Sequence, residues 1–433
     1  MIKEKKVAFY TLGCKLNFAE TSTISRQLTN IGFKRTEFND NADVYVINTC
    51  SVTENANKEC KRIIRKAKKN SPKSFIIVTG CFAQLKPKEI SLIEEVDMIL
   101  GANEKFNIPD FIHELNNNKK AVIHGCEIST LNYASSYSLY DRSRSFMKIQ
   151  DGCNYPCTYC TIPLARGKSR SDSIDNILQN VKHIAKKGIK EIVLTGVNIG
   201  DFKDKDDGRN FTELIKELDK INEIERYRIS SIEPNLITDE IINIISKSNK
   251  FMPHFHIPLQ SGSDKILAKM KRRYQTKLYE EKVNKISNKI QNVSIGADVI
   301  VGFPGETEEE FKKTLHFIKS LPISYLHVFS YSERENTKAV EYNDIVKKET
   351  RAERSKQLRI LSEKLKRSFY NSQIKNTHTA LFEKENKNGM LYGYTDNYIK
   401  VKVDYNNLLC QTKRKIKFDK IDIDGVMNAK IIN

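Results

Sequence analysis

The sequence lacks any apolar run long enough to cross a membrane. Its longest apolar stretches, FIIVTG at residues 75–80 and EIVLTGV at residues 191–197, fall well short of the ~18–20 residues that a spanning helix needs. The first residues, MIKEKKVAFYTLGC, also lack the small-residue cleavage site of a signal peptide. We therefore expect a cytoplasmic protein with no membrane partner.

Acidic residues are too few to balance the basic ones. The 73 Lys and Arg residues exceed the 54 Asp and Glu residues, which gives a net charge of +19. The basic residues also cluster, in KECKRIIRKAKK (58–69), KMKRRY (269–274) and KRKIK (413–417). Such an excess favours a polyanionic partner, and nucleic acid is the leading candidate. The alternative is a lysine-rich composition whose charge is only a solvated surface.

The alternation of apolar and polar residues predicts an α/β multidomain chain in three parts. Residues 1–118 resemble an α/β domain with a parallel sheet, in which Ser51-x-x-Glu54 predicts a helix start with a capping box. Residues 139–370 hold six strand-like segments separated by helical patterns, which indicates an incomplete, parallel-stranded (β/α) barrel. Residues 373–433 alternate in the manner of a small antiparallel β-barrel.

The cysteines do not fit a disulfide framework. Their number, nine, is odd, and cysteines in a reducing compartment more often serve metal or redox chemistry. Cys153, Cys157 and Cys160 form a C-x₃-C-x₂-C run directly after the strand-like FMKIQ. Three thiolates can hold three irons of a [4Fe-4S] cluster and leave the fourth iron open. A zinc site is the alternative, but tetrahedral zinc needs a fourth ligand and the next histidine is His183.

Three more cysteines each follow a predicted strand of the first domain. Cys14 follows KVAFYTLG, Cys50 follows DVYVINT and Cys81 follows SFIIVTG. The carboxyl ends of parallel strands form one crevice, so these thiolates could converge on a second metal centre. Small buried hydrophobic residues at the sheet ends are the alternative. Three cysteines lack this regularity and are expected to be structural or incidental: Cys60, Cys126 and Cys410.

Seven segments together carry the pattern of a known family. They are TLGCKLN (11–17), NTCSVT (48–53), GCFAQ (80–84), KIQDGCNYPCTYCTIPLARG (148–167), LTGVNIG (194–200), HIPLQSGS (256–263) and GFPGET (302–307). On these segments the sequence resembles the radical-SAM methylthiotransferases over its whole length. The resemblance implies an auxiliary [4Fe-4S] cluster on the first cysteine triad, a radical-SAM barrel with its own [4Fe-4S] cluster on the second, and a C-terminal RNA-binding TRAM barrel.

The resemblance also implies the cofactor chemistry. Replacing an aromatic C–H by C–SCH₃ requires removal of an unactivated hydrogen, which no side-chain base can achieve by proton transfer. A cofactor must therefore supply a radical. S-adenosylmethionine at the open iron of the barrel cluster would supply it, and the auxiliary cluster would carry the sulfur. An electron donor such as flavodoxin or ferredoxin is an expected partner, whereas the sequence does not indicate the sulfur source.

Several residues near these motifs have roles that stay open between two interpretations. Tyr159 resembles the aromatic position near the adenine of S-adenosylmethionine, or it packs on its own strand. Gly302 and Gly305 lie at a strand end where a barrel keeps its active face, or they are turn glycines. Arg166 could meet a carboxylate or phosphate, or it is a solvated surface arginine. Two histidines are expected to be packed and hydrogen-bonded instead of ligating: His254 and His256.

Three substrate classes compete within the family. They are tRNA with N6-threonylcarbamoyladenosine at position 37, tRNA with isopentenyladenosine there, and an aspartate of a ribosomal protein. TLGCKLN, LTGVNIG and KIQDGCN resemble the threonylcarbamoyladenosine branch, in which a methylthio group is added at carbon 2, whereas the isopentenyl branch usually reads GCQMN and LLGQNVN. A strongly basic chain would also repel a basic ribosomal protein. An RNA-binding iron–sulfur protein that senses redox state is the non-enzymatic alternative, and it would produce no 5′-deoxyadenosine.

Overall fold

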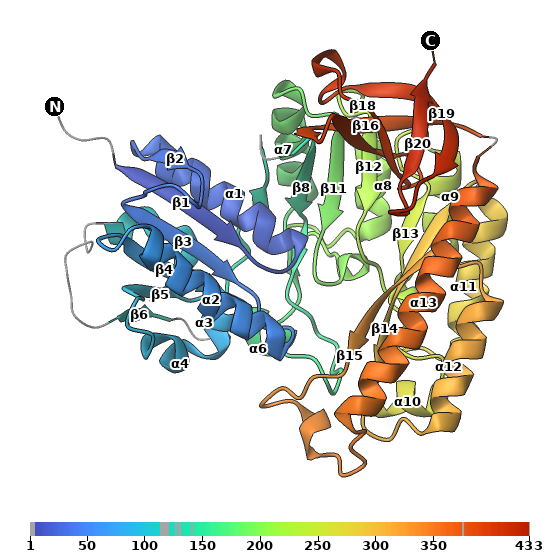
Figure 1. Ribbon diagram of the computed structural model, residues 1–433, viewed down its shortest axis with the longest axis horizontal. Helices are drawn as coiled ribbons and strands as arrows, with labels where there is room; N and C mark the ends of the chain where they lie inside the picture. The colour runs from blue at the N-terminus through green and yellow to red at the C-terminus, as the bar shows by residue number, and fades with distance from the viewer. Residues whose placement is uncertain are drawn as a thin grey trace.

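The chain folds into three parts that follow one another along the sequence (Figure 1). The computed structural model describes residues 5–112, 121–125, 128, 131–139, 142–374 and 376–432, and Cys126 lies outside them. The parts are an α/β domain, an incomplete parallel barrel and a closed β-barrel, so the predicted fold class is confirmed. Within the described ranges, none of the helices combines the length and apolarity that a membrane span requires.

A six-stranded parallel sheet forms the core of the N-terminal domain. Its strand order is β2-β1-β3-β4-β5-β6, and the strands are β1 (Lys6–Thr11), β2 (Lys34–Thr36), β3 (Val44–Thr49), β4 (Phe75–Gly80), β5 (Met98–Leu100) and β6 (Val122–His124). The helices are α1 (Lys15–Asn30), α2 (Glu54–Asn70), α3 (Cys81–Leu85), α4 (Pro87–Ser91), η1 (Glu104–Phe106) and α5 (Ile108–Phe111). Helices cover both faces of the sheet (Figure 1), so its central strands β3 and β4 are almost wholly buried and read as continuous apolar runs.

Two details of this domain differ from the sequence analysis. The N-cap of α2 is Thr53, whose side chain accepts a hydrogen bond from the Ala56 amide, while Ser51 donates to Asn57. The predicted capping box was therefore wrong, because serine and threonine are both good N-cap residues and the sequence does not choose between them. The sheet also continues past residue 118 to β6, which is too short to give a periodic signal.

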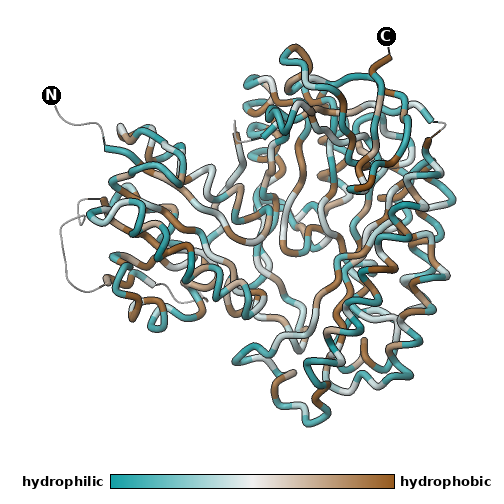
Figure 2. The backbone as a smooth tube through the Cα atoms, in the orientation of Figure 1, coloured by the Kyte–Doolittle hydropathy of each residue, from teal (hydrophilic) through white to brown (hydrophobic). Residues whose placement is uncertain are grey.

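The central part is an open barrel of six parallel strands. They are β8 (Arg144–Lys148), β11 (Glu191–Thr195), β12 (Arg226–Ile229), β13 (His254–His256), β14 (Ser294–Val301) and β15 (Tyr325–Ser330). Parallel bridges from Tyr227 to Phe251 and from Ser231 to His256 join β12 to the segment around β13. Apolar residues gather along these strands, and polar residues gather on the outer helices (Figure 2). The six segments expected to be strands are thus confirmed.

Helices and short strands complete the wall of this barrel. The short strands are β7 (Ser136–Tyr137), β9 (Gln150–Asp151) and β10 (Arg170–Ser171). The helices are α6 (Ile162–Arg166), α7 (Ile174–Lys186), η4 (Ile199–Asp201), α8 (Phe211–Lys220), η5 (Pro234–Leu236), α9 (Asp239–Lys247), α10 (Asp264–Lys269), α11 (Thr276–Lys289), α12 (Glu308–Ser320), η6 (Lys338–Glu341) and α13 (Lys348–Ser372). The long α13 packs against β15 and leads into the C-terminal part.

The C-terminal part is a closed five-stranded barrel. Its strands are β16 (Thr377–Lys387), β17 (Met390–Thr395), β18 (Lys400–Asp404), β19 (Lys413–Ile421) and β20 (Met427–Ile431), and η7 (Asn407–Leu409) precedes β19. Four pairings are antiparallel as expected, but β18 and β20 pair in parallel. In the closed order β20 lies between β18 and β19, and its antiparallel pairing with β19 leaves it parallel to β18.

Buried charges hold the C-terminal barrel against the amino ends of β8, β11 and β12. Glu191, which is fully buried, accepts from Arg228 at 3.0 Å and forms an ion pair with Arg226 at 3.5 Å. Arg226 also donates to the Thr379 backbone carbonyl of β16 at 2.7 Å. Arg144 forms an ion pair with Glu383 of β16 at 3.1 Å. The amino end of the central barrel is therefore closed by the C-terminal barrel, and the carboxyl ends of its strands are left for the site.

Candidate iron–sulfur and S-adenosylmethionine site

The structure brings the first cysteine triad to one edge of the N-terminal sheet. Cys14 caps α1 after β1, Cys50 follows β3, and Cys81 opens α3 directly after β4. These three strands are neighbours and parallel, so the cysteines lie at one edge, and the Cys50 thiol interacts electrostatically with both of the others. Burial raises the pKa of the Cys50 thiol to about 11. A positively charged metal centre would reverse that effect, because metal coordination deprotonates thiols.

Glycine is required directly before two cysteines of this triad, Cys14 and Cys81, because the chain packs closely at both places. A Cβ atom on Gly13 would lie 2.9 Å from the Cys50 sulfur, and one on Gly80 would lie 2.4 Å from the Thr49 carbonyl oxygen. Both glycines also have φ of +94°, a conformation that other residues rarely adopt. The backbone is thus specialised immediately before Cys14 and Cys81, as a cradle for a group held by the three sulfurs would require.

A buried ion-pair network lies beside this triad and joins two domains. Glu20 of α1 is fully buried and contacts Lys105 at 2.7 Å, Arg166 at 3.1 Å and Lys148 at 3.2 Å. Arg166 also contacts Asp151 at 2.9 Å. Although burial alone would raise the pKa of the Glu20 carboxyl, the surrounding cations hold it well below its usual value. Arg166 is therefore buried and meets carboxylates of the protein itself, and the interpretation as a solvated surface residue was wrong.

The second triad lies in the loop that follows β9. The backbone N–H of Tyr155 donates to Cys153 Sγ at 3.4 Å, and that of Ile162 donates to Cys160 Sγ at 3.5 Å. Burial raises the pKa of the Cys153 thiol to about 11 and that of the Cys160 thiol to about 12. N–H groups aimed at sulfur suit a thiolate, so this loop fits three ligands of a metal cluster.

Two residues that the sequence analysis did not single out complete this loop. Arg272 donates to Cys157 Sγ at 3.1 Å and forms an ion pair with Glu233. Asn235 donates to the Tyr155 hydroxyl at 2.8 Å, and its own side-chain oxygen is buried with no partner in the part of the chain that the structure describes. The basic cluster KMKRRY contains Arg272, so its charge was visible in the sequence, but its target was not.

Tyr159 and the GFPGET segment meet on one side of the second triad. The ring of Tyr159 packs edge-on against Phe303 with centroids 6.3 Å apart, and its hydroxyl lies 3.4 Å from Arg272. Gly302 and Gly305 form the turn directly after β14. Their N–H groups donate within the chain, to the Glu306 carboxylate and the Asp344 carbonyl. The structure therefore brings Tyr159 and this turn together beside the cysteines.

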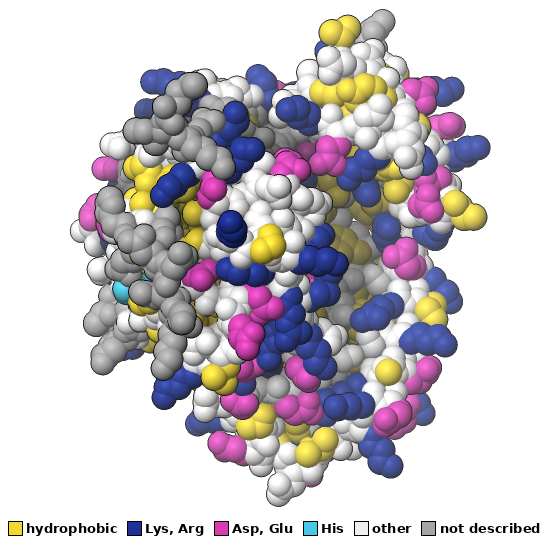
Figure 3. All heavy atoms as spheres, turned by 60° about the vertical axis from the view of Figure 1, so that its left-hand side comes forward, with side chains coloured by type: hydrophobic (Ala, Val, Ile, Leu, Met, Phe, Trp, Pro, Cys, Tyr) yellow, Lys and Arg dark blue, Asp and Glu magenta, His cyan; other side chains and the backbone are white. Residues whose placement is uncertain are grey.

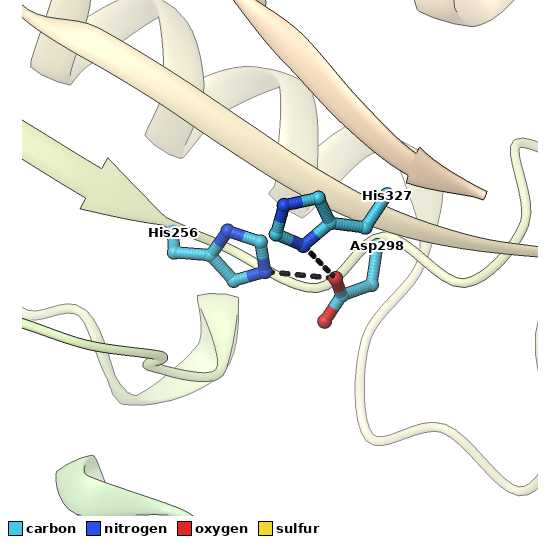
Figure 4. Close-up of side chains that lie close together, drawn as sticks. All are labelled: His256, Asp298 and His327. Atoms are coloured by element: carbon cyan, nitrogen blue, oxygen red, sulfur yellow. Dashed lines mark hydrogen bonds and ion pairs between the residues drawn. The ribbon is translucent and has the colours of Figure 1, made fainter. Parts of the chain in front are cut away.

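Three polar side chains on β13–β15 form a compact group on the barrel wall (Figure 4). Asp298 Oδ1 lies 2.8 Å from His256 Nε2 and 3.3 Å from His327 Nδ1. His254 forms a separate hydrogen bond with the Tyr325 hydroxyl at 2.9 Å. The donor atoms of the Asp298 group lie within 4.8 Å of one another, a spacing that could hold a metal ion. Their mutual hydrogen bonds already account for the group, in keeping with histidines that are packed and bonded.

The remaining described cysteines belong to neither triad. Cys60 is fully buried in the core of the N-terminal domain, and its thiol donates to the Cys50 carbonyl at 3.5 Å. Cys410 follows η7 in the C-terminal barrel, where its sulfur lies near the Lys384 and Asn406 backbone carbonyls and the Tyr405 side chain. Neither position extends a cysteine triad.

Comparison with known proteins identifies the class and then the family. The Radical SAM superfamily matches residues 147–318, and Uncharacterized protein family UPF0004 matches residues 6–101. "Threonylcarbamoyladenosine tRNA methylthiotransferase MtaB" of Bacillus subtilis is 40% identical over 407 residues, covering 91% of this chain and 89% of that protein. The Aquifex aeolicus protein of the same name is 40% identical, covering 92% of this chain and 96% of its own length. The chain is thus a radical SAM enzyme, and it belongs to the methylthiotransferase family.

A solved structure supports the fold independently of sequence. The radical S-adenosylmethionine methyltransferase TsrM of Kitasatospora setae superposes with a TM-score of 0.56 at 13% identity, over 75% of this chain and 73% of TsrM. Radical SAM enzymes use S-adenosylmethionine and a [4Fe-4S] cluster, and methylthiotransferases carry two such clusters. Both cofactors expected from the sequence are therefore confirmed, and the redox-sensor alternative is set aside because the family consists of enzymes.

Proposed function

We propose that this enzyme adds a methylthio group to carbon 2 of N6-threonylcarbamoyladenosine at position 37 of tRNA. The observation that carries the proposal is the agreement of four relatives named threonylcarbamoyladenosine tRNA methylthiotransferase, which are 36–40% identical over about nine-tenths of the chain. Relatives named "tRNA-2-methylthio-N(6)-dimethylallyladenosine synthase" match at 34% identity over 98% of the chain in Clostridium botulinum. Methylthiolation of isopentenyladenosine is thus the less supported alternative, and a ribosomal aspartate has no support among these relatives.

We assign one cluster to each cysteine triad. Cys153, Cys157 and Cys160 would hold the radical-SAM cluster, and the first triad would hold the auxiliary cluster. Once bound, the first cluster and S-adenosylmethionine supply the radical that removes the hydrogen, and the auxiliary cluster supplies the sulfur. The protein's own part is to position these groups: α3 begins at a ligand of one triad and packs against α6, which begins two residues after the other.

Residues around the second triad would bind S-adenosylmethionine. Tyr159 is assigned to the adenine, because it lies between two cluster cysteines and packs on Phe303. Gly302 and Gly305 would shape the turn that borders the same space. Arg272 would hold Cys157 and Tyr159 in a fixed relation through its two contacts. The side-chain oxygen of Asn235, which has no partner among the described residues, suits the ammonium group of the same ligand.

The distribution of Lys and Arg side chains supports tRNA as a partner. Lys and Arg side chains gather in the middle of the face that carries the N-terminal domain (Figure 3), and β19 exposes Arg414, Lys415 and Lys417. Both surfaces suit the phosphates of tRNA. We propose flavodoxin or ferredoxin as the class of electron donor, and the cytoplasm as the place of the reaction.

Mass spectrometry of tRNA nucleosides from a strain lacking this gene tests the proposed function. We expect the 2-methylthio form of threonylcarbamoyladenosine to disappear and its unthiolated precursor to accumulate. Expression of the wild-type chain should restore the product, whereas a Cys14→Ala, Cys50→Ala, Cys81→Ala variant should not. Loss of the methylthio form of isopentenyladenosine instead would refute the substrate assignment.

A further inference from the structure

Lys15 has no ion-pair partner among the residues that the structure describes. It directly follows Cys14 and is the first residue of α1. The side chain is half-buried, and no hydrogen bond or ion pair joins its ammonium group to any residue in the described part of the chain. An ammonium group that is partly removed from water without an anion is unfavourable, so this position suits an anionic ligand.

The charged and polar groups that act most strongly on Lys15 belong to the central and C-terminal barrels and not to its own domain. Burial lowers the pKa of Lys15, and four groups act on it electrostatically. Tyr398 of the C-terminal barrel and Asp298 of β14 favour its charged form, whereas Arg144 of β8 and Arg228 of β12 oppose it. They belong to three strands of the barrel wall and to the loop after β17. Lys15 therefore spans from the auxiliary cysteine triad to the wall of the barrel.

The other charged groups in this space already have partners. Arg228 donates to Glu191 at 3.0 Å, and Arg144 forms an ion pair with Glu383. Asp298 is shared by two histidines (Figure 4). Among the described residues, Lys15 is thus the cation of this group that has no hydrogen bond or close ion pair, and only Tyr398 and Asp298 favour its charge from a longer distance.

We propose that Lys15 binds the carboxylate of the threonylcarbamoyl group and so selects the substrate. The proposal rests on the function proposed above and adds the residue that reads the modification. A base that receives sulfur from one triad and loses hydrogen near the other must lie between them, within reach of the residue next to Cys14. Threonylcarbamoyl carries one carboxylate and isopentenyl carries none, so only the first can neutralise Lys15.

The same residue would act against the wrong substrate. An isopentenyl group placed at Lys15 would cover the ammonium group with apolar atoms and leave it unpaired, so the cost of removing the charge from water adds to the absence of attraction.

The test measures binding of anticodon stem-loop RNAs to the full-length enzyme with both clusters reconstituted. One RNA carries threonylcarbamoyladenosine, a second carries the same group with its carboxylate converted to a neutral amide, and a third carries isopentenyladenosine. Wild-type enzyme should bind the first RNA about ten- to a hundredfold more tightly than the second. Lys15→Gln should remove this preference, and Lys15→Arg should keep most of it. Lys415→Gln, an exposed charge change on β19, should weaken all three alike.

Two results would overturn the role of Lys15. The first is equal binding of the carboxylate and amide RNAs by wild-type enzyme, which needs no variant and so cannot be explained by misfolding. The second is an unchanged preference in a Lys15→Gln enzyme with wild-type iron content. Failure of the proposed function is distinguishable, because wild-type enzyme would then give no methylthio product on threonylcarbamoyladenosine tRNA, whatever its binding preference.

Discussion

Glu20 shows how much of the inter-domain contact depends on a single residue. It lies on α1 of the N-terminal domain, and its carboxylate contacts Lys148 and Arg166 of the central part as well as Lys105 of its own domain. Three cations converge on one acid, so removing the acid leaves the buried Lys105 without its ion pair and leaves Asp151 alone to pair with Lys148 and Arg166. The energetic cost of that removal should exceed the gain from the pairs themselves.

We expect Glu20→Gln to destabilise the contact between α1 and the barrel by about 3–5 kcal/mol. Hydrogen–deuterium exchange of the α1 amides would measure this local destabilisation without requiring the whole chain to unfold in one step. Glu94→Gln, a change at an exposed acid of the same domain, should leave exchange in α1 unaltered. Equal protection in the two variants would contradict the account of the network.

Glu191 makes the docking of the C-terminal barrel depend on pH. Burial alone would raise its pKa, but Arg228, Arg144 and Arg226 outweigh burial and lower the pKa to about 2. Because the folded pKa lies below the unfolded value of ~4.3, its stabilising contribution is complete above that value and is lost as the pH falls toward 2. Thermal unfolding of the metal-free chain should show this decrease in stability in acid, and Glu191→Gln should be less stable at neutral pH with a flatter acid limb. An identical pH profile for both proteins would exclude the linkage.

At the scale of elements, the strand ends explain the placement of both triads. The three N-terminal strands that precede these cysteines were recognisable, because a cysteine follows each apolar run within three residues. The elements that fix the triads relative to each other were not recognisable. The packing of α3 against α6 joins segments about 80 residues apart in sequence, and no local pattern encodes it.

Separate strand ends predict separate clusters. Anaerobic reconstitution should give about eight irons per chain, and alanine at Cys153, Cys157 and Cys160 should leave about four, because each cluster has its own three ligands. Alanine at Cys410, which lies in the C-terminal barrel away from both triads, serves as the control and should keep the full iron content. Wild-type protein that saturates at about four irons would contradict the two-triad assignment.

The exposed face of β19 predicts a measurable part of the tRNA affinity. Replacing Arg414, Lys415 and Lys417 by glutamine should reduce the slope of log affinity against log salt by about 0.7–0.9 for each phosphate that these side chains neutralise. Glutamine at three exposed lysines of α7 and its C-terminal cap makes the matched control: Lys182, Lys186 and Lys187. If the control set lowers the slope as much as the β19 set does, tRNA does not bind preferentially at the C-terminal barrel.

At the scale of the whole molecule, sequence patterns predicted the three domains better than the contacts between them. The three-part architecture followed from periodicity, and the chemistry followed from cysteine spacing and the family pattern. The contacts between domains depend on buried charged residues far apart in sequence, such as the ion pair of Arg166 with Glu20 and the hydrogen bond from Arg226 to β16. An arginine in PLARG reads the same whether it meets water or a buried carboxylate, so only the fold reveals its partner.

The central claim is that a radical SAM enzyme with two cysteine triads methylthiolates threonylcarbamoyladenosine in tRNA. The most direct measurement gives reconstituted enzyme, S-adenosylmethionine and a reductant two pools of tRNA, followed by mass spectrometry of the nucleosides. One pool comes from cells that cannot make isopentenyladenosine, and the other from cells that cannot make threonylcarbamoyladenosine. The account predicts methylthio product in the first pool and none in the second. Product in the second pool and none in the first would contradict it.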